Sequence, residues 1–208
     1  MATDREVQKQ WTAELQKING NFTKSGVIHL YPLSPDWAGT LVITNQSNYG
    51  TGSSIMIYIG ACWLPHDKLF KELSPEIYFG KVTYATSLYD HVPDEVRDKV
   101  ASWRVQSEPH GPFDFSLPVR AVQEYGFSLM ERMCSVEFAL QELGERVSGG
   151  KSAAPAWVNY VLALELTNRH EEALACLSDF VVRNEGRGKF IDHDFGLFAE
   201  RFRQRFDG

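Results

Sequence analysis

The segment YDHVPDE, residues 89–95, brings three carboxylates and one imidazole together over a few positions. A carboxylate beside a histidine can orient the imidazole for general acid–base catalysis, provided that both side chains face the same way. Neighbours on a strand point to opposite faces, so Asp90 and His91 would be poorly placed as such a pair. We interpret the segment as a solvated turn before a helix, with Asp94 as its N-cap or first-turn acid.

The stretch NQSNYGTGSS, residues 45–54, contains two glycines and raises the question of a phosphate-binding loop. A P-loop needs a lysine and a Ser or Thr after its second glycine, and a helix must follow. A dinucleotide fingerprint needs a strand–helix–strand unit. Neither condition is met, so we interpret Gly50 and Gly52 as turn residues that supply positive φ. Alternatively, the amides and Tyr49 present a polar, aromatic binding edge.

The remaining reactive side chains show no familiar pattern. The six histidines lack HxH, HExxH or HxxxH spacing, so we expect no metal and no cofactor. No serine lies in a G-x-S-x-G elbow, which removes one signature of a nucleophile. The three cysteines are far apart in apolar surroundings, which predicts buried thiols in a reducing compartment.

Length and charge restrict the class of protein. A chain of 208 residues can bury a sizeable core without a disulfide or metal staple. The formal net charge of −6 argues against a general nucleic-acid backbone binder and favours encounter with a basic partner. The N-terminal segment is charged, and no run approaches the roughly 18 apolar residues of a membrane span. We therefore expect a cytoplasmic protein that binds neither nucleic acid nor membrane.

The N-terminal half predicts a helix followed by strands. Val7, Trp11 and Leu15 recur at helical spacing, which predicts an amphipathic helix over residues 4–19. Short turns between apolar runs predict an antiparallel meander, with a short helix after its third strand. The expected strands cover residues 22–33, 39–46, 53–63 and 78–92. A further short helix is expected to lead into a strand near Trp103.

From Phe115 onwards the pattern becomes helical, with a break expected at Gly126. A helical hairpin joined near residues 167–170 follows, and then a stripe of phenylalanines at positions 195, 198, 202 and 206 that must be buried. The predicted fold class is α+β. We expect an α+β domain with an antiparallel sheet over residues 1–147. A helical C-terminal subdomain over residues 148–208 is expected to pack on the same core.

This order of elements resembles a group of small bacterial domains of unknown function that include immunity proteins of secreted toxin systems. The resemblance spans most of the chain and is carried by short motifs such as Asn45-Gln46-Ser47 and Tyr58-Ile59-Gly60. It implies a non-enzymatic protein that binds a cognate toxin and occludes its active site. No catalytic residues are available to carry over.

The predicted partner is a toxin with a basic surface. The residues predicted to bind it are Gln46, Asn48, Tyr49, Tyr89, Asp90, Asp94 and Glu95. Two alternatives stay open. One is an enzyme with an active site near His91 and His110, and the other is an adaptor that docks partners on its C-terminal helices.

Overall fold

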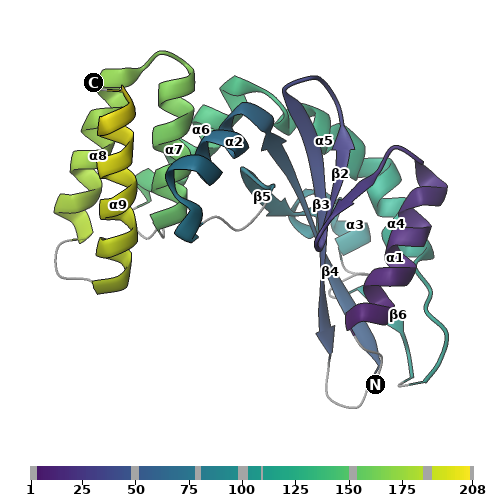
Figure 1. The fold of residues 1–208 in the computed structure, drawn as a ribbon. Coiled ribbons are helices and arrows are strands. Elements are labelled where there is room, and N and C mark those ends of the chain that lie inside the picture. The colour runs from purple at the N-terminus through teal and green to yellow at the C-terminus, as the bar shows by residue number, and fades with distance from the viewer. Residues whose placement is uncertain are drawn as a thin grey trace. The chain divides into compact units, whose positions relative to one another are not determined.

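The computed structural model describes residues 4–47, 52–77, 81–97, 103–108, 110–149, 154–184 and 189–206. It confirms the α+β class: an N-terminal helix, an antiparallel sheet and a helical C-terminal half (Figure 1). The chain divides into two compact units. The sheet unit comprises Met1–Ala61 and Ala85–Cys134, and the helical unit comprises Cys62–Tyr84 and Ser135–Gly208.

These units differ from the predicted division at residues 147 and 148, which falls inside the helical unit. The difference arises from α2 (Leu64–Leu73), which comes directly after β4 in the chain but packs with the C-terminal helices. Its Phe70 and Leu73 lie in the same hydrophobic core as Val147 and Trp157. The segment after β4 therefore belongs with the C-terminal helices. The hydrophobic spacing within one segment cannot predict this contact, because the two partners are far apart in the sequence.

Helix α1 (Asp4–Ile18) confirms the predicted apolar stripe. Val7, Trp11 and Leu15 are completely buried. The Trp11 ring lies 5.6 Å from the ring of Phe115, centroid to centroid, so the helix packs against the chain that enters α4 (Ser116–Ala121). The N-terminal helix is thus an integral part of the sheet unit's core.

The sheet is an antiparallel meander with one strand added to its side. Five strands pair in chain order, and the sixth pairs with the start of the fourth. They are β1 (Thr23–Ser25), β2 (Ile28–Pro32), β3 (Trp37–Ser47), β4 (Ser53–Trp63), β5 (Tyr84–Ser87) and β6 (Trp103–Gln106). The strand expected over residues 22–33 is a hairpin instead, because Gly26 turns the chain with a φ of 63°.

Two further expectations in the sheet unit are corrected. The strand expected over residues 78–92 is reduced, within the described residues, to β5, and the chain then forms the 3₁₀ turn η2 (Leu88–His91). The break expected at Gly126 does not occur. Helix α4 continues through the π-helical turn η3 (Val122–Gly126) into α5 (Phe127–Met133), and Gly126 packs closely against Ile59 of β4.

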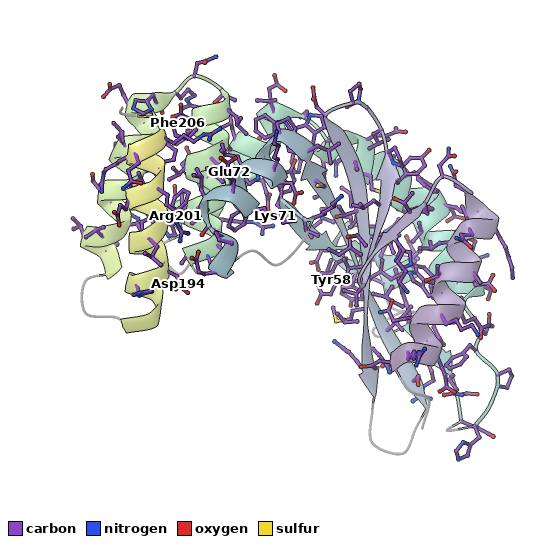
Figure 2. The ribbon with its side chains drawn as sticks, viewed as in Figure 1. Tyr58, Lys71, Glu72, Asp194, Arg201 and Phe206 are labelled. Atoms are coloured by element: carbon purple, nitrogen blue, oxygen red, sulfur yellow. The ribbon has the colours of Figure 1, made fainter. Side chains whose placement is uncertain are left out.

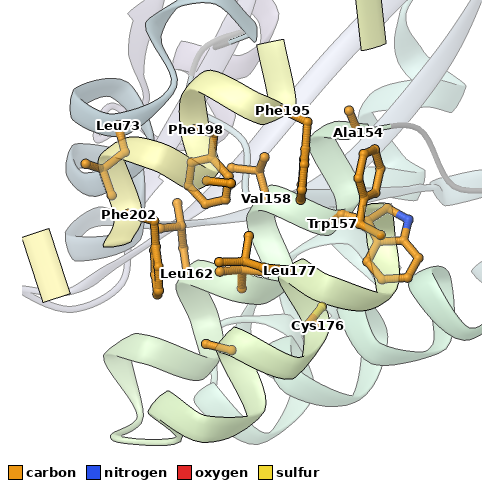
Figure 3. Packing of buried hydrophobic residues seen from close by; sticks show 14 of the residues in the cluster. Leu73, Ala154, Trp157, Val158, Leu162, Cys176, Leu177, Phe195, Phe198 and Phe202 are labelled. Atoms are coloured by element: carbon orange, nitrogen blue, oxygen red, sulfur yellow. The ribbon is translucent and has the colours of Figure 1, made fainter. Parts of the chain in front are cut away.

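The helical unit is built around the phenylalanine stripe. Its C-terminal helices α7, α8 and α9 lie side by side, with α2 against α7 and α9 (Figure 1). They follow α6, and their bounds are α6 (Val136–Ser148), α7 (Ala154–Leu166), α8 (His170–Asn184) and α9 (Lys189–Phe206). Phe195, Phe198 and Phe202 are buried against α7 and α8, as Figure 3 shows, and Phe206 is half-buried. The prediction that this stripe is buried is confirmed for these three rings.

Ion pairs hold the outer side of α9 to α2 and the 3₁₀ turn η1 (Pro75–Ile77). Arg201 contacts both carboxylate oxygens of Glu76, at 2.8 and 2.7 Å. Hydrogen bonding to Arg201 lowers the pKa of Glu76 to about 2. Arg205 contacts Glu72 at 2.6 Å. Figure 2 labels Glu72 on α2 and Arg201 on α9. Across the described residues, no helix has the length and apolar character that crossing a membrane requires.

Gly52, immediately before β4, confirms the prediction that a glycine supplies positive φ in this turn, with a φ of 89°. A Cβ at this position would overlap the backbone carbonyl of Gln106 in β6. Gly50, the second predicted turn glycine, lies outside the described residues. The close approach of β6 to β4 therefore requires a residue without a Cβ atom at position 52.

We expect Gly52→Ala to lower the free energy of unfolding by about 2–4 kcal/mol, because it combines backbone strain with a backbone clash. Gly196→Ala, at an exposed position in α9 with nothing nearby, is the control. It should be stabilising by up to about 1 kcal/mol because alanine favours a helix. Urea denaturation followed by circular dichroism measures both. Equal stability of Gly52→Ala and the wild type would contradict this account of the turn.

His66 of α2 is a buried neutral histidine. Its Nε2 lies 2.9 Å from the carbonyl oxygen of Asn159, so Nε2 carries the hydrogen and donates. Its Nδ1 has no hydrogen-bond partner among the described residues. Burial lowers the pKa of His66 to about 4, and the bond to Asn159 opposes this shift only in part. Protonation would therefore place an unpaired N–H donor inside the core.

We expect the free energy of unfolding to fall as the pH drops from about 6.5 towards 4, because only the unfolded imidazole binds a proton there. The effect of His66 should be about 1–3 kcal/mol across this window. Burial and the nearby Lys24 also lower the pKa of His29 to about 4. His29 therefore changes the free energy of unfolding in the same direction as His66. His66→Gln should flatten the pH dependence measured by urea denaturation. The exposed His110→Gln serves as the control, and an unchanged slope in His66→Gln would contradict the assignment.

Candidate functional site

Four of the predicted binding residues lie on one short segment of the sheet unit, formed by η2 and α3 (Asp94–Arg97). Leu88 and Val92 anchor this segment because both are buried. Tyr89 is half-buried, whereas the carboxylates at positions 90, 94 and 95 are exposed. The alternation presents the acids at the surface while the apolar side chains enter the core.

Arg97 ties this segment together. Its Nε donates to the carbonyl of Tyr89 at 3.4 Å, and Nη2 donates to that of Val92 at 3.3 Å. Its Nη1 lies 3.0 Å from an oxygen of Asp94, which is the expected first-turn acid of α3. The guanidinium also lies 5.6 Å from the centroid of the Tyr89 ring. One cation therefore sets the positions of the turn, the tyrosine and the start of the helix.

A hollow of about 470 Å³ adjoins His91. It is lined by His91, Tyr125, Ser128, Leu129 and Arg132. His91 Nε2 lies 3.2 Å from the Thr86 hydroxyl, and the Ser128 hydroxyl donates to the carbonyl of Tyr125 at 3.1 Å. Four of the five described lining residues are polar, so the chemistry of this hollow suits a polar group.

The residues from α5 and η3 were not predicted from the sequence as part of a site. Tyr125, Ser128 and Arg132 lie more than thirty positions after His91, so nothing local connects them to it. A weak signal does exist: positions 125, 128 and 132 follow the spacing of one helix face. These three positions are polar, in a segment whose neighbouring positions include the buried Leu129, Met130 and Met133.

The structure does not join the acid–base pairs considered from the sequence. Asp90 and His91 are neighbours on a 3₁₀ turn and not on a strand, and the hydrogen-bond partner of His91 is Thr86. His110 is exposed in the loop between β6 and α4 and does not line the hollow. The described contacts thus assemble no pair of His91 with a carboxylate.

The other predicted residues come from the β3–β4 hairpin. Gln46 is exposed at the end of β3, where its Nε2 lies 2.7 Å from the sulfur of Met56. Its carbonyl accepts a hydrogen bond from the Ser54 hydroxyl at 2.5 Å. Asn48 and Tyr49 lie outside the described residues. The prediction that this hairpin belongs to the binding surface therefore stays a prediction.

The cysteines of the described chain behave as core thiols. Cys62 and Cys176 are buried, and Cys134 is half-buried at the end of α5. Burial raises the pKa of Cys134 to about 12, and that of Cys176 also to about 12. Both are therefore thiols and not reactive thiolates at neutral pH. Within the described ranges, no three His, Cys, Asp or Glu side chains gather in a way that could hold a metal ion.

The helical unit has a hollow of its own, of about 280 Å³, between α6, α7 and α8. Trp157 and Tyr160 contribute aromatic walls to it. Arg183 lies over the Trp157 ring, 5.6 Å from its centroid, and 3.4 Å from Asp179. This is the surface that an adaptor docking on the C-terminal helices would use, and that alternative stays a prediction.

Comparison of the chain with protein-family models, with curated proteins and with solved structures gives no match.

We expect Arg97→Ala to loosen the segment formed by η2 and α3. Amide hydrogen exchange over residues 88–96 should become about tenfold faster or more, because two hydrogen bonds to carbonyls, an ion pair and the contact with the Tyr89 ring are lost together. Global stability should fall by only about 1 kcal/mol, since the contacts are partly exposed. Arg104→Ala, at an exposed position on β6, is the control. Unchanged exchange in Arg97→Ala would show that the segment is held by its apolar anchors alone.

Proposed function

We propose that this protein is a non-enzymatic bacterial immunity protein that acts in the cytoplasm, where it binds a cognate secreted toxin and occludes its active site. The toxin assignment rests on the resemblance described above. The observation that carries the binding role is the exposed pair of carboxylates, Asp90 and Glu95, on the segment held by Arg97. Neither carboxylate forms an ion pair with another described residue.

A basic partner fits this surface. Unpaired carboxylates on an acidic protein attract cationic groups over distances of roughly 8–10 Å at physiological salt. Such complementarity accelerates encounter and disfavours acidic competitors. The side chain of Asp94, although exposed, already has Arg97 as a partner and contributes less charge to the encounter.

The fixed geometry of the segment also supports a binding role. Residues that are ordered before binding lose less conformational entropy on association, so more of the contact energy appears as affinity. Tyrosine and arginine are frequent hot-spot residues, and Tyr89 lies against Arg97 in the centre of the segment. Occlusion of a toxin's active site needs an interface of only about 800 Å² on each partner.

The partner can be identified with the full chain. The tagged protein is used for affinity capture from the organism that encodes it, and the captured protein is identified by mass spectrometry. Its enzymatic activity is then titrated with the purified chain. We expect complete loss of activity at one equivalent. A captured partner whose activity is unchanged by excess protein would contradict the immunity function.

Charge reversal locates the surface. We expect the double variant Asp90→Lys/Glu95→Lys to weaken toxin binding by about 100-fold or more, mainly through slower association, because attraction becomes repulsion. The control is Asp36→Lys, at an exposed position in the turn before β3 and outside this surface. It changes the net charge by half as much as the double variant does. Surface plasmon resonance at two salt concentrations measures both rates. Equal affinities of the double variant and the wild type would place the toxin interface elsewhere on the protein.

A further inference from the structure

We propose that the hollow beside His91 is a binding site for the oxyanion of a small molecule, a carboxylate or a phosphate. The site is separate in its chemistry from the acidic residues that are proposed to meet the toxin. It is formed by the free protein, so it does not require a partner.

The chemistry of the lining suits an anion. Arg132 supplies a guanidinium with several N–H donors and Tyr125 supplies a phenolic hydroxyl, whereas the Ser128 hydroxyl already donates to the carbonyl of Tyr125. His91 adds an imidazole, and among the described residues no carboxylate lines the hollow. Within this part of the chain, donors and a permanent positive charge therefore meet without a carboxylate to balance them. Charge-assisted hydrogen bonds from arginine to carboxylate or phosphate are among the strongest that proteins form.

Arg132 is available to bind an anion. Six arginines of the described chain form ion pairs with carboxylates, and Arg132 is not among them. It is exposed at the rim of the hollow, so its guanidinium can reach an anion without first breaking an ion pair. The buried Leu129 places an apolar group in the lining, and lower polarity strengthens the attraction between an arginine and an anion.

The π-helical turn η3 contributes to the shape of the hollow. The N–H of Phe127 donates to the carbonyl of Val122, five residues earlier, so this turn holds one residue more than an α-helical turn. Such an insertion rotates the preceding helix by about 100° relative to α5. Wide turns of this kind occur frequently at functional sites. Here the turn brings Tyr125 to the hollow while Gly126 packs against Ile59 of β4.

The hydrogen bonding of His91 also leaves one ring nitrogen for a ligand. The Thr86 hydroxyl holds Nε2 at 3.2 Å, whereas Nδ1 makes no hydrogen bond with a described residue. The ring is thus fixed by its neighbour and retains one nitrogen for a ligand. Exposed acids in the chain next to these elements are Asp90, Glu124 and Glu131, and none of them lines the hollow.

Size restricts the ligand. At about 470 Å³ the hollow falls in the range of small-molecule sites, roughly 300–1,000 Å³, and exceeds the volume of a bare phosphate. The ligand class is therefore a small molecule that presents one oxyanion to Arg132 and places a short body along Leu129.

Titration of the full chain with inorganic phosphate and, separately, with acetate tests the site at constant ionic strength. Backbone amide chemical shifts are followed by nuclear magnetic resonance. We expect saturable shifts over residues 125–132 and near His91, with dissociation constants of about 1–10 mM for these minimal probes. Saturation by phosphate alone identifies a phosphorylated ligand. Saturation by acetate alone, or by both probes, shows that the site accepts ligands with a carboxylate.

Arg132→Gln should weaken binding of the probe by about tenfold or more, because the charge-assisted hydrogen bonds are lost. Arg120→Gln, at an exposed position of the preceding helix, should leave it unchanged. Asp90→Lys/Glu95→Lys should retain the site, which separates this test from that of toxin binding. Shifts that do not saturate in the wild type, or equal affinity in Arg132→Gln, would overturn the proposal. Matching melting temperatures establish that the variants are folded.

Discussion

The sheet unit depends on the burial of β4. Ile55, Ile57 and Ile59 of this strand are almost inaccessible to solvent, and the residues between them are half-buried. A strand covered on both faces needs partners on both edges, because unpaired backbone groups inside a core are costly. Strand β3 covers one edge along the hairpin. The other edge is shared by β5 and β6, each only 4 residues long beside the 11 residues of β4.

This shared edge explains where the candidate site lies. The chain must leave the sheet after β5 and return as β6, and the segment formed by η2 and α3 is the described part of that excursion. Leu88 and Val92 return to the core, and Arg97 secures the turn between them. The segment that carries the exposed acids and His91 thus lies between the two short strands that pair with the same edge of β4.

Charge separates the interior of the protein from its surface. Burial keeps His66 neutral and Cys176 protonated, whereas the carboxylates that bear unpaired charge, such as Asp90 and Glu95, are exposed. The surface around His91 therefore has two characters. Acidic side chains extend along η2 and α3, and the donors of Tyr125 and Arg132 line the adjoining hollow. A partner that contacted both the acidic side chains and the donors would need cationic and anionic groups at matching positions. Such a requirement is a source of specificity.

The sequence by itself determined those features that a repeating pattern expresses locally. The spacing of Val7, Trp11 and Leu15 specified the buried face of α1, the phenylalanine spacing specified that of α9, and the bounds of β4 match the predicted strand over residues 53–63. Tertiary structure alone decided which elements meet. It placed α2 with the C-terminal helices, shortened the expected strand before Tyr89, and continued the helix through Gly126. It also brought Arg132 to His91. The physical reason is that periodicity reports which face of an element is apolar, whereas the partner that covers this face depends on packing across the whole chain.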